Sequence, residues 1–135
     1  MASSKGSVSL NRKAVFVSIT KALNGKVPDV KVNVTPLQDI ARGCWYVNDA
    51  KIKQCELLVA VYDGVIKGVW EIDRNAGWRI MSINAIPTRT FKPADIDPRR
   101  KYCELKGKVM CDIVGHRLTV IRGMARMRGP IQYNF

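Results

Sequence analysis

The sequence predicts a single α+β domain, built as a small mixed or antiparallel β-barrel with two or three short helices. Short β-branched and aromatic runs, about five to seven of them, are separated by turn residues. The helix signals are short, and no long helix alternates with the strands as in a doubly wound fold. The chain has 135 residues, enough to bury one modest core but not two. We therefore predict a flexible tail over residues 1–12 and one domain over residues 13–135.

The first predicted strand is the apolar run AVFVSIT, from Ala14 to Thr20. Two turn signals follow it, Asn24-Gly25 and Pro28-Asp29. Residues 21–34 are therefore predicted to form a loop or an irregular hairpin.

Two short helices are predicted next. The stretch Thr35-Pro36-Leu37-Gln38 has the form of a capping box with proline at the first helical position. It predicts a helix that runs to about Ala41 and ends at Gly43. Asn48 can cap a further helical turn within residues 47–55.

A hairpin is predicted by CELLVAVYDGVIKGVWEID, in which Asp63-Gly64 joins two apolar runs. The run from Leu57 to Tyr62 is almost wholly apolar, which indicates a central strand with both faces covered. Strand periodicity then places Ile66, Trp70 and Ile72 on one face and Lys67, Glu71 and Asp73 on the other. We interpret the two acids as salt-bridge partners of nearby Lys and Arg.

The second half of the chain predicts further short elements. Residues 78–86 are expected to be a third strand of this meander, and the proline-rich residues 87–100 an irregular surface excursion. One or two strands are expected within residues 101–115, and a short helix before Gly123. Residues 130–135 are expected to close the sheet as a last strand.

Charge is the unusual feature of the composition. The 23 Lys and Arg residues oppose 11 Asp and Glu residues, which gives a formal net charge of +12. Such a surplus favours anionic partners, so we expect nucleic acid or a nucleotide. No apolar run is long enough to span a membrane and the start does not resemble a secretory signal, so we expect no membrane partner and a cytoplasmic location. Four cysteines without zinc-site spacing are expected to be free thiols.

The stretch IARGCWYV carries a first candidate binding site, formed by Arg42, Trp45 and Tyr46. A planar ring can stack on a base while a guanidinium binds a phosphate or a base edge. The alternative is that Trp45 belongs to the core and the aliphatic part of Arg42 covers it.

A second candidate site is the arginine-rich C-terminal segment HRLTVIRGMARMRGPIQYNF. Its arginines suit bidentate phosphate contacts, and its glycines allow a ligand close to the backbone. The alternative is a solvated basic face. The predicted phosphate-binding residues are Arg117, Arg122, Arg126 and Arg128.

Catalytic signals are weak, so a non-catalytic protein is favoured and no cofactor or metal is predicted. The single histidine, His116, excludes a mechanism with two imidazoles. One enzymatic alternative is a small metal-dependent nuclease that uses Glu104 and Lys106 with Asp95 or Asp97.

Three stretches together resemble a family of small proteins from bacteria and phages with a PUA-like or EVE-like barrel. They are ARGCWYVNDAKIKQCELLVAVYDGVIKGVWEID, YCELKG and VGHRLTVIRGMARMRGPIQYNF, and the resemblance covers roughly residues 40–135. Gln132 departs from the family pattern, which has arginine there. PUA-like folds bind RNA or flip modified bases into a pocket, so the resemblance implies a nucleic-acid ligand. The matched positions are Arg42, Trp45, Tyr62, Gly64, Lys67, Trp70, Pro130, Ile131, Tyr133 and Asn134.

The leading hypothesis is therefore a binding module that recognises nucleic acid, including a modified or flipped base. Its pocket would hold the base with Arg42, Trp45, Tyr46, Lys67, Tyr133 and Asn134, and the C-terminal arginines would hold phosphates. The alternative is a bacterial or phage protein that sequesters a cyclic or linear signalling nucleotide in the same pocket.

Overall fold

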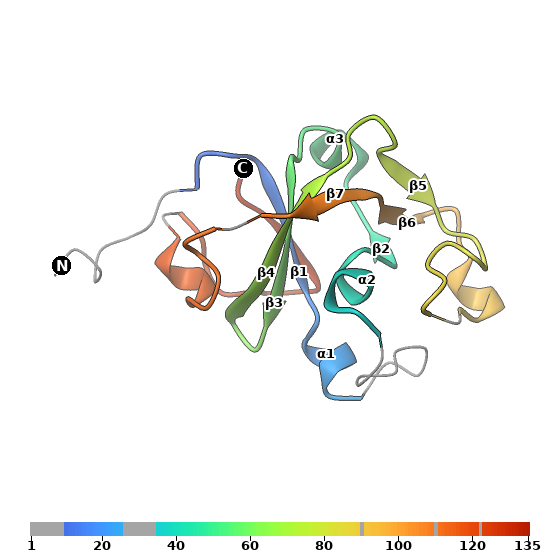
Figure 1. Ribbon diagram of the computed structural model, residues 1–135, viewed down its shortest axis with the longest axis horizontal. Coiled ribbons are helices and arrows are strands. Elements are labelled where there is room, and N and C mark those ends of the chain that lie inside the picture. The colour runs from blue at the N-terminus through green and yellow to red at the C-terminus, as the bar shows by residue number, and fades with distance from the viewer. Residues whose placement is uncertain (1–9, 26–34, 90, 110, 122) are drawn as a thin grey trace, which may run out of the picture.

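The computed structural model describes residues 10–25, 35–89, 91–109, 111–121 and 123–135 (Figure 1). Its strands form two sheets. The larger sheet contains β1 (Ala14–Ser18), β3 (Leu57–Tyr62), β4 (Val65–Ile72), β7 (Leu105–Lys108) and β8 (Ile131–Tyr133), in the order β7-β4-β3-β1-β8. The smaller sheet contains β2 (Trp45–Tyr46), β5 (Trp78–Ile80) and β6 (Arg100–Cys103), in the order β2-β6-β5.

The helices of the described residues are short. They are α1 (Thr20–Leu23), α2 (Leu37–Ala41), α3 (Asp49–Ile52) and the 3-10 helices η2 (Pro93–Asp95) and η3 (Leu118–Val120). The α+β class is thus confirmed, whereas the two sheets of the described structure are open and do not form a closed barrel. None of the helices in these ranges is long and apolar enough to cross a bilayer.

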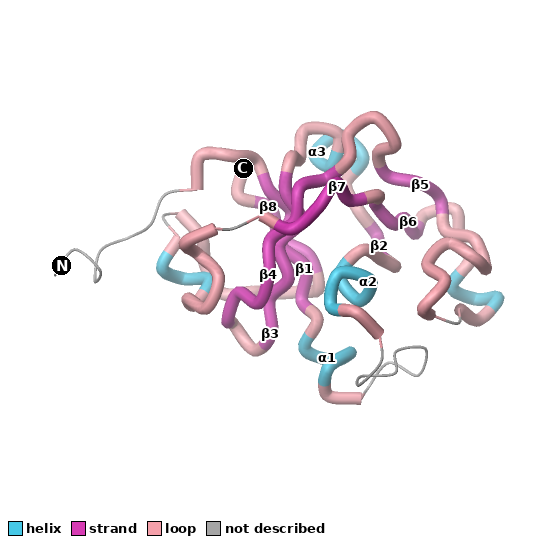
Figure 2. The backbone as a smooth tube through the Cα atoms, in the orientation of Figure 1, coloured by secondary structure: helices cyan, strands magenta, loops and turns pink. Residues whose placement is uncertain are grey.

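The larger sheet is mixed, because β1 and β3 are parallel while its other neighbouring strands are antiparallel. A parallel pair needs a long crossover connection. Here residues 19–56 supply it, and they contain all three α-helices and β2. Figure 2 shows α1 and α2 beside this sheet, on the side that also holds the smaller sheet.

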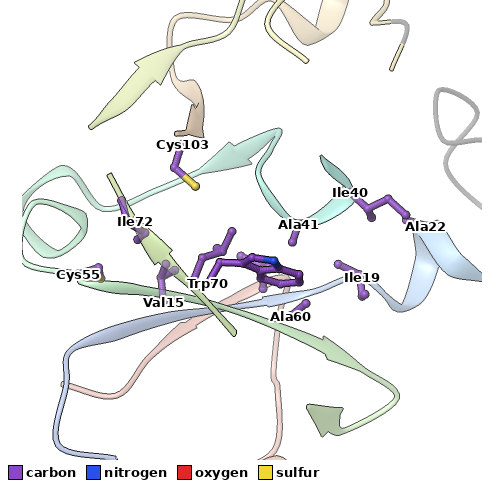
Figure 3. Close-up of a cluster of buried hydrophobic side chains, with 12 residues drawn as sticks. Val15, Ile19, Ala22, Ile40, Ala41, Cys55, Ala60, Trp70, Ile72 and Cys103 are labelled. Carbon is purple, nitrogen blue, oxygen red and sulfur yellow. The ribbon is translucent and has the colours of Figure 1, made fainter. Parts of the chain in front are cut away.

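Strand β3 is covered on both faces, as its apolar run predicts, and residues 57–61 are all buried. On one face, Leu58 and Ala60 join a core that also contains Trp70 (Figure 3). On the other face, Leu57, Val59 and Val61 pack under the segment that holds η3. In Figure 1 this orange segment lies across the large sheet from α2 and the smaller sheet.

The hairpin turn is confirmed, but one predicted face is wrong. Asp63 and Gly64 both have positive φ, 49° and 81°, as a type I′ turn requires. A bulge follows: Ala60 pairs with Gly68 and Val61 pairs with Ile66, so Lys67 is the extra residue. The extra residue reverses the alternation, and Ile66 therefore packs on the face opposite Trp70 rather than beside it.

Several local predictions need correction. Thr20 begins helix α1 instead of ending the first strand, and α2 begins at Leu37 with Pro36 as its N-cap. The predicted strand over residues 78–86 is shortened to β5, which belongs to the smaller sheet and pairs with β6 rather than with β4. Strand β2 was not predicted at all. By contrast, the Asn48 cap is confirmed, since its side chain accepts a hydrogen bond from the Lys51 amide at 3.0 Å.

A residue near the start of the chain, Arg12, forms ion pairs with two acidic residues of the hairpin stretch. Residues 1–9 lie outside the described residues, but Arg12 of the predicted tail contacts Glu56 at 3.2 Å and Glu71 at 3.4 Å. Ordered contacts therefore begin before residue 13. The prediction of a basic partner is confirmed for Glu71. Asp73 instead accepts hydrogen bonds from the amides of residues 75 and 76 and so caps the turn after β4.

Candidate functional site

A cavity of about 390 Å³ lies between α1, the end of α2, β2 and the residues before β8. Its aromatic lining is Trp45 and Phe91, and its basic lining is Lys21, Arg89 and Arg100. None of the lining residues that the structure describes is acidic. Small-molecule pockets span about 300–1,000 Å³, so this volume suits a compact ligand. The cavity therefore combines apolar surface with a positive potential.

Trp45 is fixed at the cavity wall. Its half-buried ring packs against the main core, and its Nε1 donates a hydrogen bond of 2.8 Å to the carbonyl of Ala41, in helix α2. Strand β2 holds its backbone beside Lys101 of β6. Trp45 therefore contacts the core, as the alternative interpretation expects, and it also lines the cavity.

Arg100 carries an unused donor. Its guanidinium carbon lies 4.3 Å from the ring centroid of Tyr46, and its Nη1 donates to the carbonyl of Cys44 at 3.4 Å. Its Nε is buried without a hydrogen-bond partner among the described residues. Burial alone would lower the pKa of Arg100, but interactions with the Cys44 and Tyr46 side chains outweigh burial and raise this pKa, so the charge persists.

Arg89 is a buried basic residue of the cavity lining. It is only 8% exposed and donates hydrogen bonds to the carbonyls of Asp39 and Ile40, in the last turn of α2, and of Gly43, which follows the helix. Its guanidinium carbon lies 4.9 Å from the ring centroid of Phe91. Arg89 thus positions the loop at Gly43 and contributes charge rather than a freely moving donor.

Arg42 does not line this cavity, contrary to the predicted Arg42–Trp45 pocket. Its side chain is 15% exposed and bridges Asp39, at 3.0 Å, and Glu104, at 2.8 Å. Its Nε also donates to the carbonyl of Cys103 at 2.9 Å. Arg42 thus belongs to an ion-pair network that ties the end of α2 to the end of β6.

The other predicted base-contacting residues are spread over the surface. Tyr46 is half exposed and stacks on Arg100 outside the cavity lining. Lys67 is exposed and lies above the Tyr62 ring. The Tyr133 hydroxyl accepts from the Asn48 amide at 2.9 Å, and the Asn134 side chain is bonded to the backbone of Arg12 and Ala14. Asn134 thus holds the first strand in place.

Arg117, Arg126 and Arg128, the described members of the predicted phosphate-binding set, do not line the cavity. Arg117 forms a β-bridge with Val65, beside the hairpin turn. Arg126 and Arg128 are exposed in the segment that precedes β8, and Arg122 lies outside the described residues. Among the described residues of this segment, Gly129 and Pro130 line the cavity. The described residues of the composite site predicted from sequence therefore do not line one common cavity.

Sequence reasoning missed Arg89, Phe91 and Arg100 because they fall in the predicted surface excursion. The available signal was Phe91, a large aromatic residue in a proline-rich segment, which is buried in a third small core.

Two of the acids named in the nuclease alternative, Glu104 and Asp97, take part in ion pairs. Glu104 pairs with Arg42, and Asp97 pairs with Arg99 at 2.7 Å. Hydrogen bonds from Arg99 lower the pKa of Asp97 to about 2. The side chain of Asp95 lies outside the described residues. Within the described part of the chain, no three His, Cys, Asp or Glu side chains are grouped so that they could hold a metal ion.

Comparisons with known proteins do not assign the chain to a family. No family model matches it, and searches of curated proteins and of solved structures give no significant match.

Proposed function

We propose that this protein binds nucleic acid without catalysis and holds one nucleotide in the cavity beside Trp45. The observation that carries the proposal is the lining, which joins two aromatic rings to three basic side chains with no acid among its described members. Aromatic rings bind bases through stacking, and arginines bind phosphates through charged hydrogen bonds. Arg100 is the residue we expect to contact phosphate, because it lines the cavity and its raised pKa keeps the guanidinium charged.

The charge outside the cavity favours a polymer over a single nucleotide. The formal net charge is +12, and basic residues such as Lys106, Lys108, Arg126 and Arg128 are exposed away from the cavity lining. A strand that enters the cavity with one nucleotide would lay its neighbouring phosphates along such a surface. We also propose that the chain belongs to the PUA-like family. We infer nucleic-acid binding from the cavity and the charge and not from this membership.

The test is a titration of labelled single-stranded DNA and RNA oligonucleotides, followed by fluorescence anisotropy. We expect binding at about 50 mM salt and a steep, linear loss of log K with log salt up to about 200 mM. Trp45→Leu keeps apolar volume against the core but removes the stacking ring, and should weaken binding by about 5- to 150-fold. Circular dichroism of each variant verifies that it folds.

A matched pair of variants separates the cavity from general charge. Arg100→Gln removes the cavity guanidinium, and Arg79→Gln removes an exposed arginine of β5 that does not line the cavity. We expect Arg100→Gln to weaken binding by about tenfold or more, as for a charged hydrogen bond, and Arg79→Gln to weaken it much less. Equal losses, or no binding at low salt, would refute the proposal. Tight binding of mononucleotides with the same variant pattern would instead support the sequestration of a free nucleotide.

A further inference from the structure

The lining of the cavity beside Trp45 has a buried part and an exposed part. Arg89 is buried in it, whereas Lys21 and residues 129–130 are exposed. Ser18 ends β1, and its amide donates a hydrogen bond of 2.8 Å to the carbonyl of Pro130. Among the described lining residues, the solvent-facing end of the cavity is therefore the end where β1 leads into α1 and the chain enters β8.

The chain that reaches this end of the cavity, residues 125–130, is tied to the fold at both of its ends. Gln132 of β8 donates a hydrogen bond of 3.0 Å from its Nε2 to the carbonyl of Ala125, and the other end accepts the hydrogen bond from Ser18. Met127 packs on the core cluster of the opposite face of the large sheet. These contacts fix the backbone from which the exposed side chains of residues 125–130 project. We call these residues the arginine segment.

The two arginines of this segment have no partner in the described structure. Arg126 and Arg128 are exposed, and neither forms an ion pair or a hydrogen bond with a described residue. Arg12 and Arg42, by contrast, each contact two acids. Guanidinium groups bind phosphates through paired, charged hydrogen bonds. The arginine segment therefore carries two unpaired phosphate-binding groups directly beside the exposed end of the cavity.

Gly129 joins these arginines to the cavity, and neither packing nor backbone conformation requires glycine there. A Cβ atom at Gly129 would meet nothing within 4 Å, and its φ lies outside the left-handed region that favours glycine. Glycine also allows a ligand to approach the backbone closely. Because Gly129 is exposed and lines the cavity, its missing side chain leaves open space at the solvent-facing end.

We propose that a strand with one nucleotide in this cavity leaves it over Gly129, and that Arg126 and Arg128 bind the phosphates that follow. Lys21 adds a further positive charge at the same end. This inference rests on the proposed function and adds the path of the strand to it. The ligand is then a single strand that extends beyond the bound nucleotide, and not a mononucleotide.

The test compares two double variants by fluorescence anisotropy with a labelled oligothymidylate. Arg126→Gln with Arg128→Gln removes two charges from the arginine segment. The control, Lys53→Gln with Arg79→Gln, removes two charges from exposed residues that do not line the cavity, so both proteins have the same net charge. In the first variant we expect the slope of log K against log salt to become shallower by about 1.4, which is two single-strand phosphate contacts at about 0.7 each. The control should change the slope little.

The outcomes separate the path of the strand from the proposed function. An equal change of slope in the two double variants, or no change in the arginine-segment variant, overturns the path. If Trp45→Leu and Arg100→Gln still weaken binding in that case, the nucleic-acid function stands and only the path is wrong. If the arginine-segment variant has a shallower slope but Trp45→Leu has no effect, the strand does not enter the cavity, and the proposed function and the path fail together.

A substitution at Gly129 tests the mouth of the cavity without removing charge. Gly129→Val places a side chain where the strand would pass, and should weaken oligothymidylate binding by about tenfold or more. Gly107→Val is the matched control, because a Cβ at Gly107 also meets nothing within 4 Å but lies in the edge strand β7, outside the cavity lining. The two variants should have similar unfolding midpoints, and Gly107→Val should bind like the wild type. Binding of Gly129→Val at wild-type strength would overturn the path over Gly129.

Discussion

Replacement of Gly68 by alanine should destabilise the protein, although alanine is ordinarily the better residue in a strand. A Cβ atom at Gly68 would lie 2.6 Å from Cη2, 3.0 Å from Cζ2 and 3.1 Å from Cζ3 of Trp70. Non-bonded carbon atoms are most stable at about 3.5–4.0 Å. The indole has little room to move, because Trp70 is 3% exposed and lies among Ala41, Ala60 and other core side chains (Figure 3).

The expected magnitude comes from two opposed terms. Overpacking a core costs about 1–3 kcal/mol, and the rigid ring places Gly68→Ala in the upper part of that range. Alanine has a lower conformational entropy than glycine in the unfolded chain, which stabilises the folded state by about 0.5–1 kcal/mol. The free energy of unfolding should therefore fall by about 1–2 kcal/mol. With a urea m-value near 2 kcal/mol/M, the unfolding midpoint should fall by about 0.5–1 M.

The assay is urea denaturation followed by circular dichroism, with Gly107→Ala as the matched control. Gly107 lies in the edge strand β7, and a Cβ there would meet nothing within 4 Å. Gly107→Ala should therefore be neutral or slightly stabilising. The Gly68→Ala cost should also shrink in a Trp70→Phe background, because the two residues are in contact. If Gly68→Ala is as stable as Gly107→Ala, the close packing of Trp70 on Gly68 is wrong.

Three further predictions follow from the ion pairs and the thiols. Arg42→Ala leaves the buried carboxylate of Asp39 without its arginine partner, so the free energy of unfolding measured by urea denaturation should fall by about 3 kcal/mol. A fall of less than about 1 kcal/mol would contradict the ion-pair network. Burial raises the pKa of the Cys55 thiol to about 12, so mass spectrometry should detect alkylation of half-buried Cys44 well before alkylation of Cys55 at pH 8. Equal rates of alkylation at the two thiols would contradict this prediction. Asp97 should titrate near pH 2 when its carboxyl signal is followed by NMR. Because the pKa of Asp97 is depressed in the folded state, its contribution to stability is present above about pH 4 and is lost as the pH falls through about 2. A titration midpoint near pH 4 would contradict the Arg99 contact.

The sequence alone determined the features that depend on neighbouring residues. The Asp63-Gly64 turn, the buried run of β3 and the Asn48 cap of α3 all follow from signals within a few positions. The strand character of β1 and β8 also follows from local composition. These features occur as predicted because the backbone conformation of a turn, a cap or an apolar strand is set locally.

The tertiary structure decided which segments meet. It made β1 parallel to β3, moved the Trp78 strand into a second sheet and inserted the bulge at Lys67 that turned Ile66 to the opposite face. In the tertiary structure Arg42 pairs with acids from two different segments. The basic residues that line the cavity include Arg89 and Arg100, and Arg42 is not among them. Strand partners and side-chain contacts join residues far apart in the chain, so their free energies depend on which surfaces are buried together. Local spacing carries no information about that choice.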